Sequence, residues 1–310
     1  MVDIDSAVVT GGLGGSGSWV VDNLAKQGVN VLCIDQFGLS GDAPDNVSFY
    51  QADLTEQGEA WELIEYADPD AVIHFANIPE MGVFAGSRTF ENNTLANYNV
   101  MVAAGRVGAE VVWTSSECTY GTVFTETTEL PEYFPIDEAH PTGAPDPYGT
   151  SKVVGEEIAN MVTRQYGVPI TSIRPSWINY PGEYFTTEIR ESFDPETAAI
   201  TGDRNTHIPS GNFWSYIDIR DIVSLVDAVL DADIEGHEVY LGVADENYLG
   251  RSTAETIEAV FGDVPDECAL EGEQSALSNA KAKAELDWKP AHTWRSALNE
   301  DVPGPSFVEN

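Results

Sequence analysis

The sequence predicts an α/β fold, in which a doubly wound parallel sheet is followed by a smaller C-terminal lobe. As far as Arg174-Pro175, short apolar runs alternate with amphipathic stretches of helical length. This order builds a parallel sheet with helices on both faces. A glycine-rich turn at residues 11–17 joins the first apolar run to the first amphipathic stretch, and beyond Pro175 the alternation stops. Together these observations indicate a Rossmann-type sheet and a less regular second part.

The elements of the first part follow from their apolar patterns. Runs of apolar and β-branched residues predict strands at Ala7–Thr10, Asn30–Asp35, Val47–Tyr50, Ala71–Ala76, Glu110–Ser115 and Ile170–Arg174. Apolar residues at helical spacing predict helices at Trp19–Gly28, Trp61–Tyr66 and Asn92–Gly105, and from Tyr148 to Gly167. A helix between most successive strands makes those strands parallel neighbours.

The second part gives weaker signals. Residues 177–212 are rich in Gly, Pro, Asn and Thr, which predicts loops and short helices over the carboxyl edge of the sheet. A strand at Ser215–Ile219, a helix at Asp221–Leu230 and a strand at Glu238–Leu241 are expected to return to the core. The remainder to about Leu298 is expected to form a small helical lobe, and residues 299–310 a loose tail.

The charge of the chain is strongly negative. The 310 residues include 52 Asp and Glu against 14 Lys and Arg, a formal net charge of -38. The acids are spread along the whole sequence, whereas a disordered acidic protein carries charge in blocks and has few aromatic residues. Such a surface is typical of proteins in a salt-saturated cytosol, as in halophilic archaea. No basic face is available for phosphates, so nucleic acid is excluded as a partner.

We expect the fold to loosen as salt is removed. Like charges destabilise the compact state in dilute buffer, whereas in molar salt the screening length falls to about 3 Å. Circular dichroism of thermal unfolding, over KCl concentrations from molar to dilute, measures the effect. The midpoint should fall with the salt concentration, and a salt-independent midpoint would contradict this interpretation.

Other classes of protein find no support in the sequence. No run of about 18 apolar residues and no basic-then-apolar leader is present, so neither a membrane span nor a signal peptide is expected. The three cysteines, Cys33, Cys118 and Cys268, fit no disulfide or metal spacing. We therefore expect a cytoplasmic protein without a metal site.

The glycine turn and the end of the second strand predict a dinucleotide site. The turn allows backbone N–H groups and a helix N-terminus to face a pyrophosphate without a side chain in the way. Asp35 follows the turn by about 20 residues, where a carboxylate can accept both ribose hydroxyls of adenosine. A 2′-phosphate would meet that carboxylate, and residues 36–38 supply no arginine. NAD is therefore favoured over NADP, although a solvated loop acid would look the same in the sequence.

A second motif predicts redox chemistry on an alcohol. Tyr148 and Lys152 are four residues apart and share one face of a helix. A free phenol has a pKa near 10, and a neighbouring cation lowers it. Such a pair is commonly two surface residues, but here it follows Pro147 and precedes Gly155-Glu156. With the glycine turn upstream, the pair indicates a nicotinamide-dependent oxidoreductase.

The chain resembles the extended short-chain dehydrogenase/reductase family, also called the NAD-dependent epimerase/dehydratase family. The matching residues cover nearly the whole first part in family order. They are Thr10-Gly11-Gly12-x-Gly14-x-x-Gly17, Asp35, Asp53-Leu54, His74-Phe75-Ala76, Asn92, Ser115-Ser116, Tyr120-Gly121, Tyr148-x-x-x-Lys152, Gly155-Glu156 and Arg174-Pro175. The second part matches only at Tyr216-Ile217-Asp218, Asp221, Ala280-Lys281 and Leu286-x-Trp288.

The resemblance implies roles for these residues. The catalytic residues would be Ser116, Tyr148 and Lys152. Cofactor contacts would come from Gly11, Gly14, Gly15, Ser16, Gly17, Asp35, Asp53, Leu54, Ala76, Asn77, Asn92, Tyr148, Lys152 and Ser176. Asp53 would bind the adenine amino group, although it could equally cap a turn, and His74 is expected to be a packed strand residue. Residues 1–176 would form the NAD-binding domain and residues 177–310 a substrate-binding lobe, with 215–241 returning to the main sheet.

The resemblance also suggests a substrate and an assembly. The residues expected to contact substrate are Ser115, Ser116, Glu117, Trp177, Asn179 and Trp214. Glu117 stands where the family's dehydratases hold part of an acid pair, and Cys118 replaces the second acid, which disfavours 4,6-dehydration. Relatives pair through the helices that here span Asn92–Gly105 and Tyr148–Gly167, so a homodimer is expected.

Departures from the family pattern favour an uncharged sugar. Nucleotide-sugar epimerases read Tyr-Phe-Asn after the strand-end arginine, but here Pro175-Ser176-Trp177 follows it. Two further phosphate-binding arginines have no counterpart near Trp214 and Glu271. We therefore expect an aldose 1-dehydrogenase that oxidises a free sugar of the L-arabinose or galactose type to its lactone.

Three alternatives stay open. A nucleoside-diphosphate-sugar 4-epimerase, similar to UDP-glucose 4-epimerase, remains possible if Arg190, Arg204 or Arg251 rebuilds a phosphate site. A uronic acid fits if Arg190 reaches the pocket. A non-catalytic NAD-sensing protein would keep the cofactor site alone. The two tryptophans could equally serve lobe packing.

Overall fold

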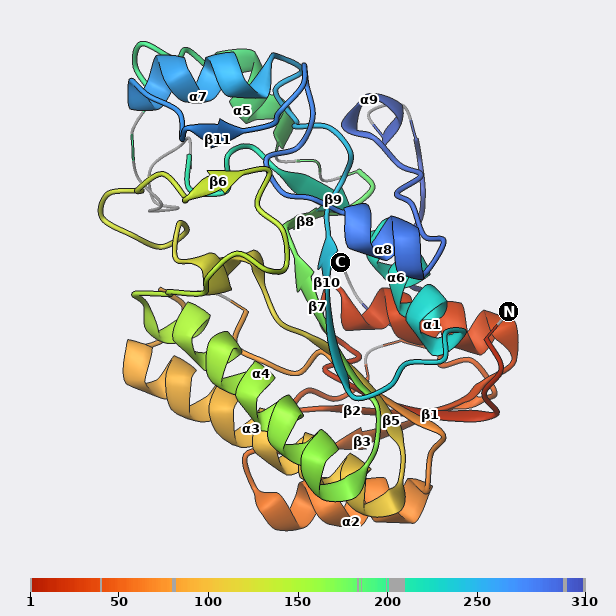
Figure 1. Cartoon of the computed structure of the whole chain (residues 1–310). Helices are drawn as coiled ribbons and strands as arrows, with labels where there is room; N and C mark the ends of the chain where they lie inside the picture. Colours follow the sequence, from red (N-terminus) through yellow and green to blue (C-terminus); the bar gives the residue numbers. More distant parts are fainter. Residues whose placement is uncertain are drawn as a thin grey trace.

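The computed structural model describes residues 2–39, 41–79, 82–182, 184, 186–198, 200, 210–297 and 300–308. Figure 1 shows one sheet with helices on both of its faces, and a second group of short elements gathered beyond one end of that sheet. Among the described helices, none combines the length and the apolar character that crossing a bilayer requires.

The main sheet has the parallel, doubly wound topology that the sequence predicts. Its strands are β1 (Ser6–Thr10), β2 (Asn30–Asp35), β3 (Val47–Gln51), β4 (Ala71–His74), β5 (Glu110–Thr114), β7 (Ile170–Pro175) and β10 (His237–Gly242). They lie in the order β10-β7-β5-β4-β1-β2-β3, and every neighbouring pair is parallel. The order reverses between β1 and β4, which opens a crevice at the carboxyl ends of the strands.

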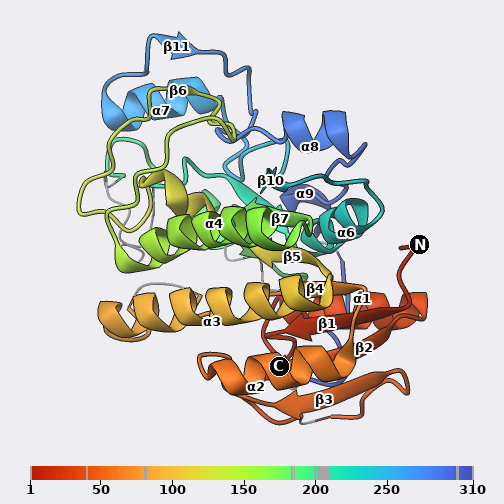
Figure 2. The same ribbon diagram turned by 60° about the horizontal axis from the view of Figure 1, so that its bottom comes forward.

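Helices cover both faces of this sheet, as Figures 1 and 2 show. On one face, α1 (Gly17–Gln27) buries Val20 and Leu24 against β1 and β2, and α6 (Ile219–Leu230) buries Leu225 beside β5 and β10. On the other, α2 (Gln57–Ala67), α3 (Gly86–Val107) and α4 (Pro147–Tyr166) bury Ile64 and Val100. The strands are therefore buried on both sides, which explains their continuous apolar runs.

Helix α3 begins earlier than its sequence predicts. The expected start was Asn92, because the preceding residues are polar and lack an apolar stripe, but the helix starts at Gly86. Asn93, which lies within the predicted part of the helix, binds the loop that precedes α3. Its side-chain oxygen accepts a hydrogen bond from the Ile78 N–H at 2.8 Å, and its nitrogen donates to the Ile78 carbonyl at 3.0 Å. This contact fixes the loop after β4 against the helix.

The second part is built from short elements. These are β6 (Tyr133–Phe134), β8 (Trp177–Asn179), α5 (Thr186–Ser192), β9 (Tyr216–Asp218), α7 (Thr253–Phe261), β11 (Glu267–Cys268), α8 (Ala280–Glu285) and α9 (Trp294–Ala297). Strand β9 pairs with β8 outside the main sheet, so the return expected at 215–241 is made by α6 and β10 and not by β9. The division into residues 1–176 and 177–310 stays a prediction.

The prediction of a loose tail at residues 299–310 is wrong for residues 300–308, which are the part of it that the structure describes. The Phe307 ring is fully buried and lies 5.7 Å from the Phe49 ring of β3, centroid to centroid. Arg220 of α6 forms an ion pair with Glu300. A large aromatic side chain near the end of a polar segment therefore anchors the tail to the core of the main sheet.

Candidate active site

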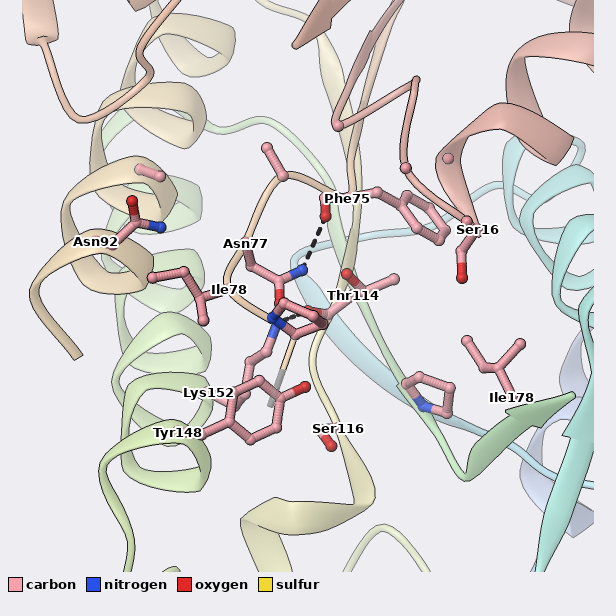
Figure 3. A pocket seen from close by; sticks show the side chains of 18 of the residues that line it. Ser16, Phe75, Asn77, Ile78, Asn92, Thr114, Ser116, Tyr148, Lys152 and Ile178 are labelled. Atoms are coloured by element: carbon pink, nitrogen blue, oxygen red, sulfur yellow. Dashed lines mark hydrogen bonds between the residues drawn. The ribbon is translucent and has the colours of Figure 1, made fainter. Parts of the chain in front are cut away.

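A single cleft lies at the carboxyl ends of the strands, where the order of the sheet reverses. Its volume is about 640 Å³. The predicted site residues that line it are Gly11, Gly14, Gly15, Ser16, Gly17, Asp35, Asp53, Leu54, Ala76, Asn77, Asn92, Ser115, Ser116, Glu117, Tyr148, Lys152, Ser176 and Trp177. Residues from six strand ends and four helices thus meet in one place, and Figure 3 shows several of them facing the same space.

The glycine turn at one end of the cleft is shaped for a close backbone approach. Gly11 has a positive φ of 68°, and a Cβ there would lie 2.6 Å from the Ala76 nitrogen. A Cβ on Gly17 would lie 2.2 Å from the Gly11 carbonyl oxygen. Larger residues are therefore excluded at both positions. The first turn of α1 starts here without a side-chain cap on its N–H groups, and such a helix N-terminus fits a pyrophosphate.

Asp35 stands beside this turn, at the end of β2. Its Oδ2 accepts a hydrogen bond from the Leu13 N–H at 2.9 Å, and its Oδ1 accepts from the Phe37 N–H at 3.2 Å. Both bonds hold the carboxylate in the cleft, where it can still accept ribose hydroxyls. No arginine is among the described residues that line the cleft, so nothing described there would offset the repulsion between Asp35 and a 2′-phosphate.

Asp53 caps a turn, which is one of the two interpretations that its sequence allows, and its binding of adenine stays a prediction. Its Oδ1 accepts hydrogen bonds from the Thr55 N–H at 3.0 Å and the Thr55 hydroxyl at 2.7 Å, so it does cap a turn. The same residue also lines the cleft beside Leu54. Capping therefore fixes Asp53 without removing it from the cleft.

Asn77 supplies an acceptor farther along the cleft. Its side-chain nitrogen donates to the Phe75 carbonyl at 2.8 Å, drawn as a dashed line in Figure 3. Its Oδ1 is buried and has no hydrogen-bond partner among the described residues. A buried acceptor left unpaired costs free energy. A dinucleotide hydroxyl would satisfy it, which is a further sign that the cleft fits such a cofactor.

Tyr148 and Lys152 form the other end of the cleft. Asp146 caps α4 by accepting hydrogen bonds from the Tyr148 N–H at 2.8 Å and the Gly149 N–H at 2.9 Å, which fixes the turn that carries the tyrosine. The Lys152 nitrogen lies 5.5 Å from the centroid of the Tyr148 ring. In Figure 3 both side chains extend from α4 into the cleft.

The ammonium of Lys152 is held in a desolvated place. Its nitrogen donates to the Thr114 carbonyl at 2.7 Å, and the side chain is 1% exposed. Burial lowers the pKa of Lys152 to about 7, and the electrostatic influence of Cys118 and Glu156 partly offsets this effect. When it is protonated, its charge acts through a low dielectric and therefore favours the phenolate of Tyr148.

Ser116 completes the group from the end of β5. Its Oγ accepts a hydrogen bond from the Cys118 N–H at 3.1 Å and so caps the short 3-10 helix η1 (Glu117–Tyr120). The hydroxyl hydrogen is left to donate to a ligand. Ser116 lines the same cleft as Tyr148, and both side chains are labelled in Figure 3.

A family model described as "NAD dependent epimerase/dehydratase family" matches residues 7–242. The chain belongs to this family. The match spans the main sheet together with β8, β9 and α6, and the family's description carries the dependence on NAD that the sequence predicts.

Curated relatives and solved structures agree with this assignment. A "UDP-glucose 4-epimerase" of Lactobacillus helveticus is 28% identical, with 92% of each chain covered. A "Putative UDP-glucose 4-epimerase" of Methanocaldococcus jannaschii is 32% identical over 54% of each chain. The solved UDP-glucose 4-epimerase of Thermotoga maritima with UDP-glucose has a TM-score of 0.68 at 22% identity, covering 94% of this chain and 96% of its own. At that identity the structure supports the fold alone.

Two motifs of this epimerase/dehydratase chain, Gly155-Glu156 and Arg174-Pro175, form a buried ion pair that stabilises the fold. Arg174 donates to Glu156 twice, from Nε to Oε1 at 2.8 Å and from Nη2 to Oε2 at 2.7 Å. The Ser115 hydroxyl donates to the same Oε1 at 2.6 Å. Ser115 therefore lines the cleft, but its hydroxyl is engaged by the buried ion pair and not directed to a substrate.

His74 has the structural role that the sequence predicts. The Thr10 hydroxyl donates to its Nδ1 at 2.6 Å, and its Nε2 is paired with the Asn97 side-chain oxygen at 2.9 Å. Burial, aided by the charge of Lys152, lowers the pKa of His74 to about 3. The ring is neutral at physiological pH and is no base for the reaction.

Glu117 brings a buried carboxylate to the cleft. The Ser176 hydroxyl donates to Glu117 Oε2 at 2.7 Å, and Glu117 is buried although it lines the cleft. Beside it, the Trp177 indole packs edge-on against the Tyr248 ring, 6.1 Å between centroids, and also lines the cleft. This part of the cleft therefore offers a hydrogen-bond acceptor next to an aromatic surface.

Two residues expected to contact substrate are placed elsewhere. Trp214 is fully buried and packs against Phe193, 5.3 Å between ring centroids. Its backbone φ is 58°, and this left-handed turn directs the indole into the core of the second part. Asn179 is fully buried in β8, where its side chain donates to the Trp177 carbonyl at 3.0 Å. Neither residue lines the cleft.

The arginines considered for a phosphate site are also not in the described cleft. Arg190 stacks on Trp294, 4.0 Å from the ring centroid, and Arg251 lies 5.4 Å from the Phe193 ring. Neither residue lines the cleft. Arg204 lies outside the described residues. A guanidinium contact with a diphosphate is thus absent from the part of the cleft that the structure describes.

Sequence reasoning missed several lining residues, above all Tyr180, together with Gln36, Phe37, Ile78 and Ile178. Tyr180 follows β8 and reaches Ser16 in the glycine turn, with 2.8 Å between the two hydroxyl oxygens. The two residues are 164 positions apart, and no local pattern could reveal the contact. The described residues contain no group of three or more His, Cys, Asp or Glu side chains suited to a metal ion.

Proposed function

We propose that this chain oxidises an alcohol carbon of a sugar, with NAD as cofactor and Tyr148 as the base. One observation carries the proposal: a single cleft joins the glycine turn and Asp35 at one end to Tyr148, Lys152 and Ser116 at the other. The separation of these ends along the sheet suits a dinucleotide whose nicotinamide would reach the tyrosine.

Each catalytic side chain has a separate role toward the substrate. Tyr148, as phenolate, takes the proton of the sugar hydroxyl, and the Lys152 ammonium stabilises that phenolate. Ser116 donates a hydrogen bond to the same substrate oxygen and holds it as the carbonyl forms. NAD, when bound, supplies the acceptor for the hydride that leaves the carbon. Asp35 and Asn77 would hold its two riboses.

The content of the described cleft favours a free aldose oxidised at C1 to its lactone. The acids Asp35, Asp53 and Glu117 line it, whereas Lys152 is the one cation among the described lining residues. A diphosphate would meet this negative field without a guanidinium to bind it. Glu117 can accept hydrogen bonds from sugar hydroxyls, and Trp177 offers an apolar surface to the ring. Pentoses and hexoses of the L-arabinose and galactose type fit this chemistry.

The comparisons favour a second candidate, a nucleoside-diphosphate-sugar 4-epimerase. Both curated relatives described above are named UDP-glucose 4-epimerase, one of them as putative. One aligns with 92% of this chain and the other with 54%. The same Tyr148, Lys152 and Ser116 would then remove and return the hydrogen at a ring carbon. On this point the names of the relatives support the epimerase more directly than the dehydrogenase. A non-catalytic NAD sensor would have no use for the catalytic group.

A substrate panel in molar KCl separates these functions. The protein is mixed with NAD and either free aldoses or UDP-galactose, and both NADH absorbance and the sugar products are followed. An aldose dehydrogenase accumulates NADH over many turnovers with a free sugar. A 4-epimerase converts UDP-galactose to UDP-glucose without net NADH. Activity with neither class, in a preparation that binds NAD, would contradict the proposal and favour the sensor.

The homodimer and the cytoplasmic location expected from the sequence are proposals as well. Phe90, Leu95 and Tyr98 on α3 are exposed large apolar side chains, and α3 lies alongside α4 in Figure 2. An apolar face of this kind suits pairing with a second copy. Sedimentation in molar KCl measures the oligomeric state directly.

A further inference from the structure

Tyr180 brings the second part of the chain onto the glycine turn. It follows β8, and its hydroxyl oxygen lies 2.8 Å from the Ser16 hydroxyl oxygen. A Cβ built on Gly15 would lie 2.9 Å from that Tyr180 oxygen. The phenol is therefore in direct contact with the turn, and Tyr180 lines the same cleft as the turn. In Figure 3 the Ser16 hydroxyl points toward the strand that carries Ile178.

Ser16 is free to make this contact because it does not cap its own helix. It occupies the N-cap position of α1, yet its side chain accepts no hydrogen bond from the helix N–H groups. A serine in this position usually makes such a bond. Here the hydroxyl is turned to Tyr180. The Ser18 N–H donates to the Gly14 carbonyl at 3.1 Å, and no side-chain cap occupies the other N–H groups of the first turn.

The charges around the turn make neutral donors important. The one cation among the described lining residues is Lys152, which is engaged by the Thr114 carbonyl at the opposite end of the cleft. Asp35 and Asp53 are the charged groups at the adenosine end. A pyrophosphate on the turn therefore depends on backbone N–H groups and on hydroxyls. A phenol hydroxyl that donates to an anion makes a strong, charge-assisted hydrogen bond.

We propose that Tyr180 binds the pyrophosphate of the dinucleotide and closes the second part over it. Its hydroxyl, positioned by Ser16, donates a hydrogen bond to a phosphate oxygen. Tyr180 belongs to the region that is expected to bind substrate. The same segment therefore contacts both the cofactor and the substrate, and it slows release of the cofactor. This inference rests on the proposed cofactor site and is independent of which sugar is oxidised.

The test is calorimetric binding to Tyr180→Phe in molar KCl, with three probes. NAD and ADP carry a diphosphate, and adenosine does not. We expect the affinities for NAD and ADP to fall about tenfold, since a hydrogen bond to a charged group is lost, and the affinity for adenosine to stay unchanged. Tyr66→Phe, at an exposed tyrosine of α2, is the matched control and should change none of the three.

Other results would overturn the inference. Equal weakening of all three probes would make Tyr180 a packing residue, and unchanged binding of NAD and ADP would leave it without a role at the pyrophosphate. Ser16→Ala provides a second variant, in which NAD and ADP should weaken and adenosine should not. If the wild-type protein bound neither NAD nor ADP, the proposed function would fail, which is distinguishable from a failure confined to Tyr180→Phe.

Discussion

Replacing Tyr148 with Phe is expected to lower kcat by about 100- to 10,000-fold, the usual contribution of a positioned acid or base. In the proposed reaction the phenolate of Tyr148 takes the substrate proton, and Phe has no oxygen to do so. The ring remains, so its packing against Phe124, at 5.9 Å between centroids, is kept. Steady-state kinetics with the substrate that the panel identifies measure the loss.

Binding separates loss of chemistry from loss of the site. NAD affinity of Tyr148→Phe should stay within a few fold of the wild-type value, because the glycine turn and Asp35 are untouched. Tyr66→Phe serves as the control for the substitution itself. Undiminished kcat in Tyr148→Phe would remove the base from the account, whereas loss of NAD binding would show that the phenol holds the cofactor instead.

Replacing Arg174 with Met is expected to lower the free energy of unfolding by about 3–5 kcal/mol, the range seen when one partner of a buried ion pair is removed. Both side chains of the pair with Glu156 are largely buried. The remaining carboxylate would lose two hydrogen bonds and its counter-charge. Chemical denaturation at constant molar KCl measures the change.

Two comparisons make this result specific. Lys26→Met breaks an exposed i, i+4 pair with Asp22 and should cost less than about 1 kcal/mol. Adding Glu156→Gln to Arg174→Met should recover part of the lost stability, because the unpaired charge disappears. If Arg174→Met cost no more than Lys26→Met, the buried pair would not hold β7 to α4.

The main sheet was predictable because each strand carries its own signal. Ala7–Thr10 and Ile170–Arg174 are apolar runs between turns, and the observed strands differ from them by one residue at an end. Features that depend on contacts between distant residues could not be predicted from the sequence. Asn93 binds the Ile78 backbone of a distant loop, and Phe307 anchors a segment that looks like a loose tail.

That the glycine turn, Asp35, Ser116 and Tyr148 line one cleft was predictable, because the motifs place them at strand ends and at the start of α4. The lining contributed by the second part of the chain was not. Whether Trp177 or Trp214 faces the cleft depends on the pairing of β8 with β9 and on the left-handed backbone of Phe213 and Trp214. No propensity predicts such a backbone for bulky residues. Tyr180 was missed for the same reason, since its contact with Ser16 exists only in the folded chain.

The central claim is that a dinucleotide on the glycine turn presents its nicotinamide to Tyr148. A crystal structure of the protein with NAD, grown from molar salt, tests it most directly. The account predicts the pyrophosphate at residues 11–17, the adenosine ribose on Asp35 and the nicotinamide beside Tyr148 and Lys152. A dinucleotide bound outside this cleft, or seated with its adenine beside Tyr148, would contradict it.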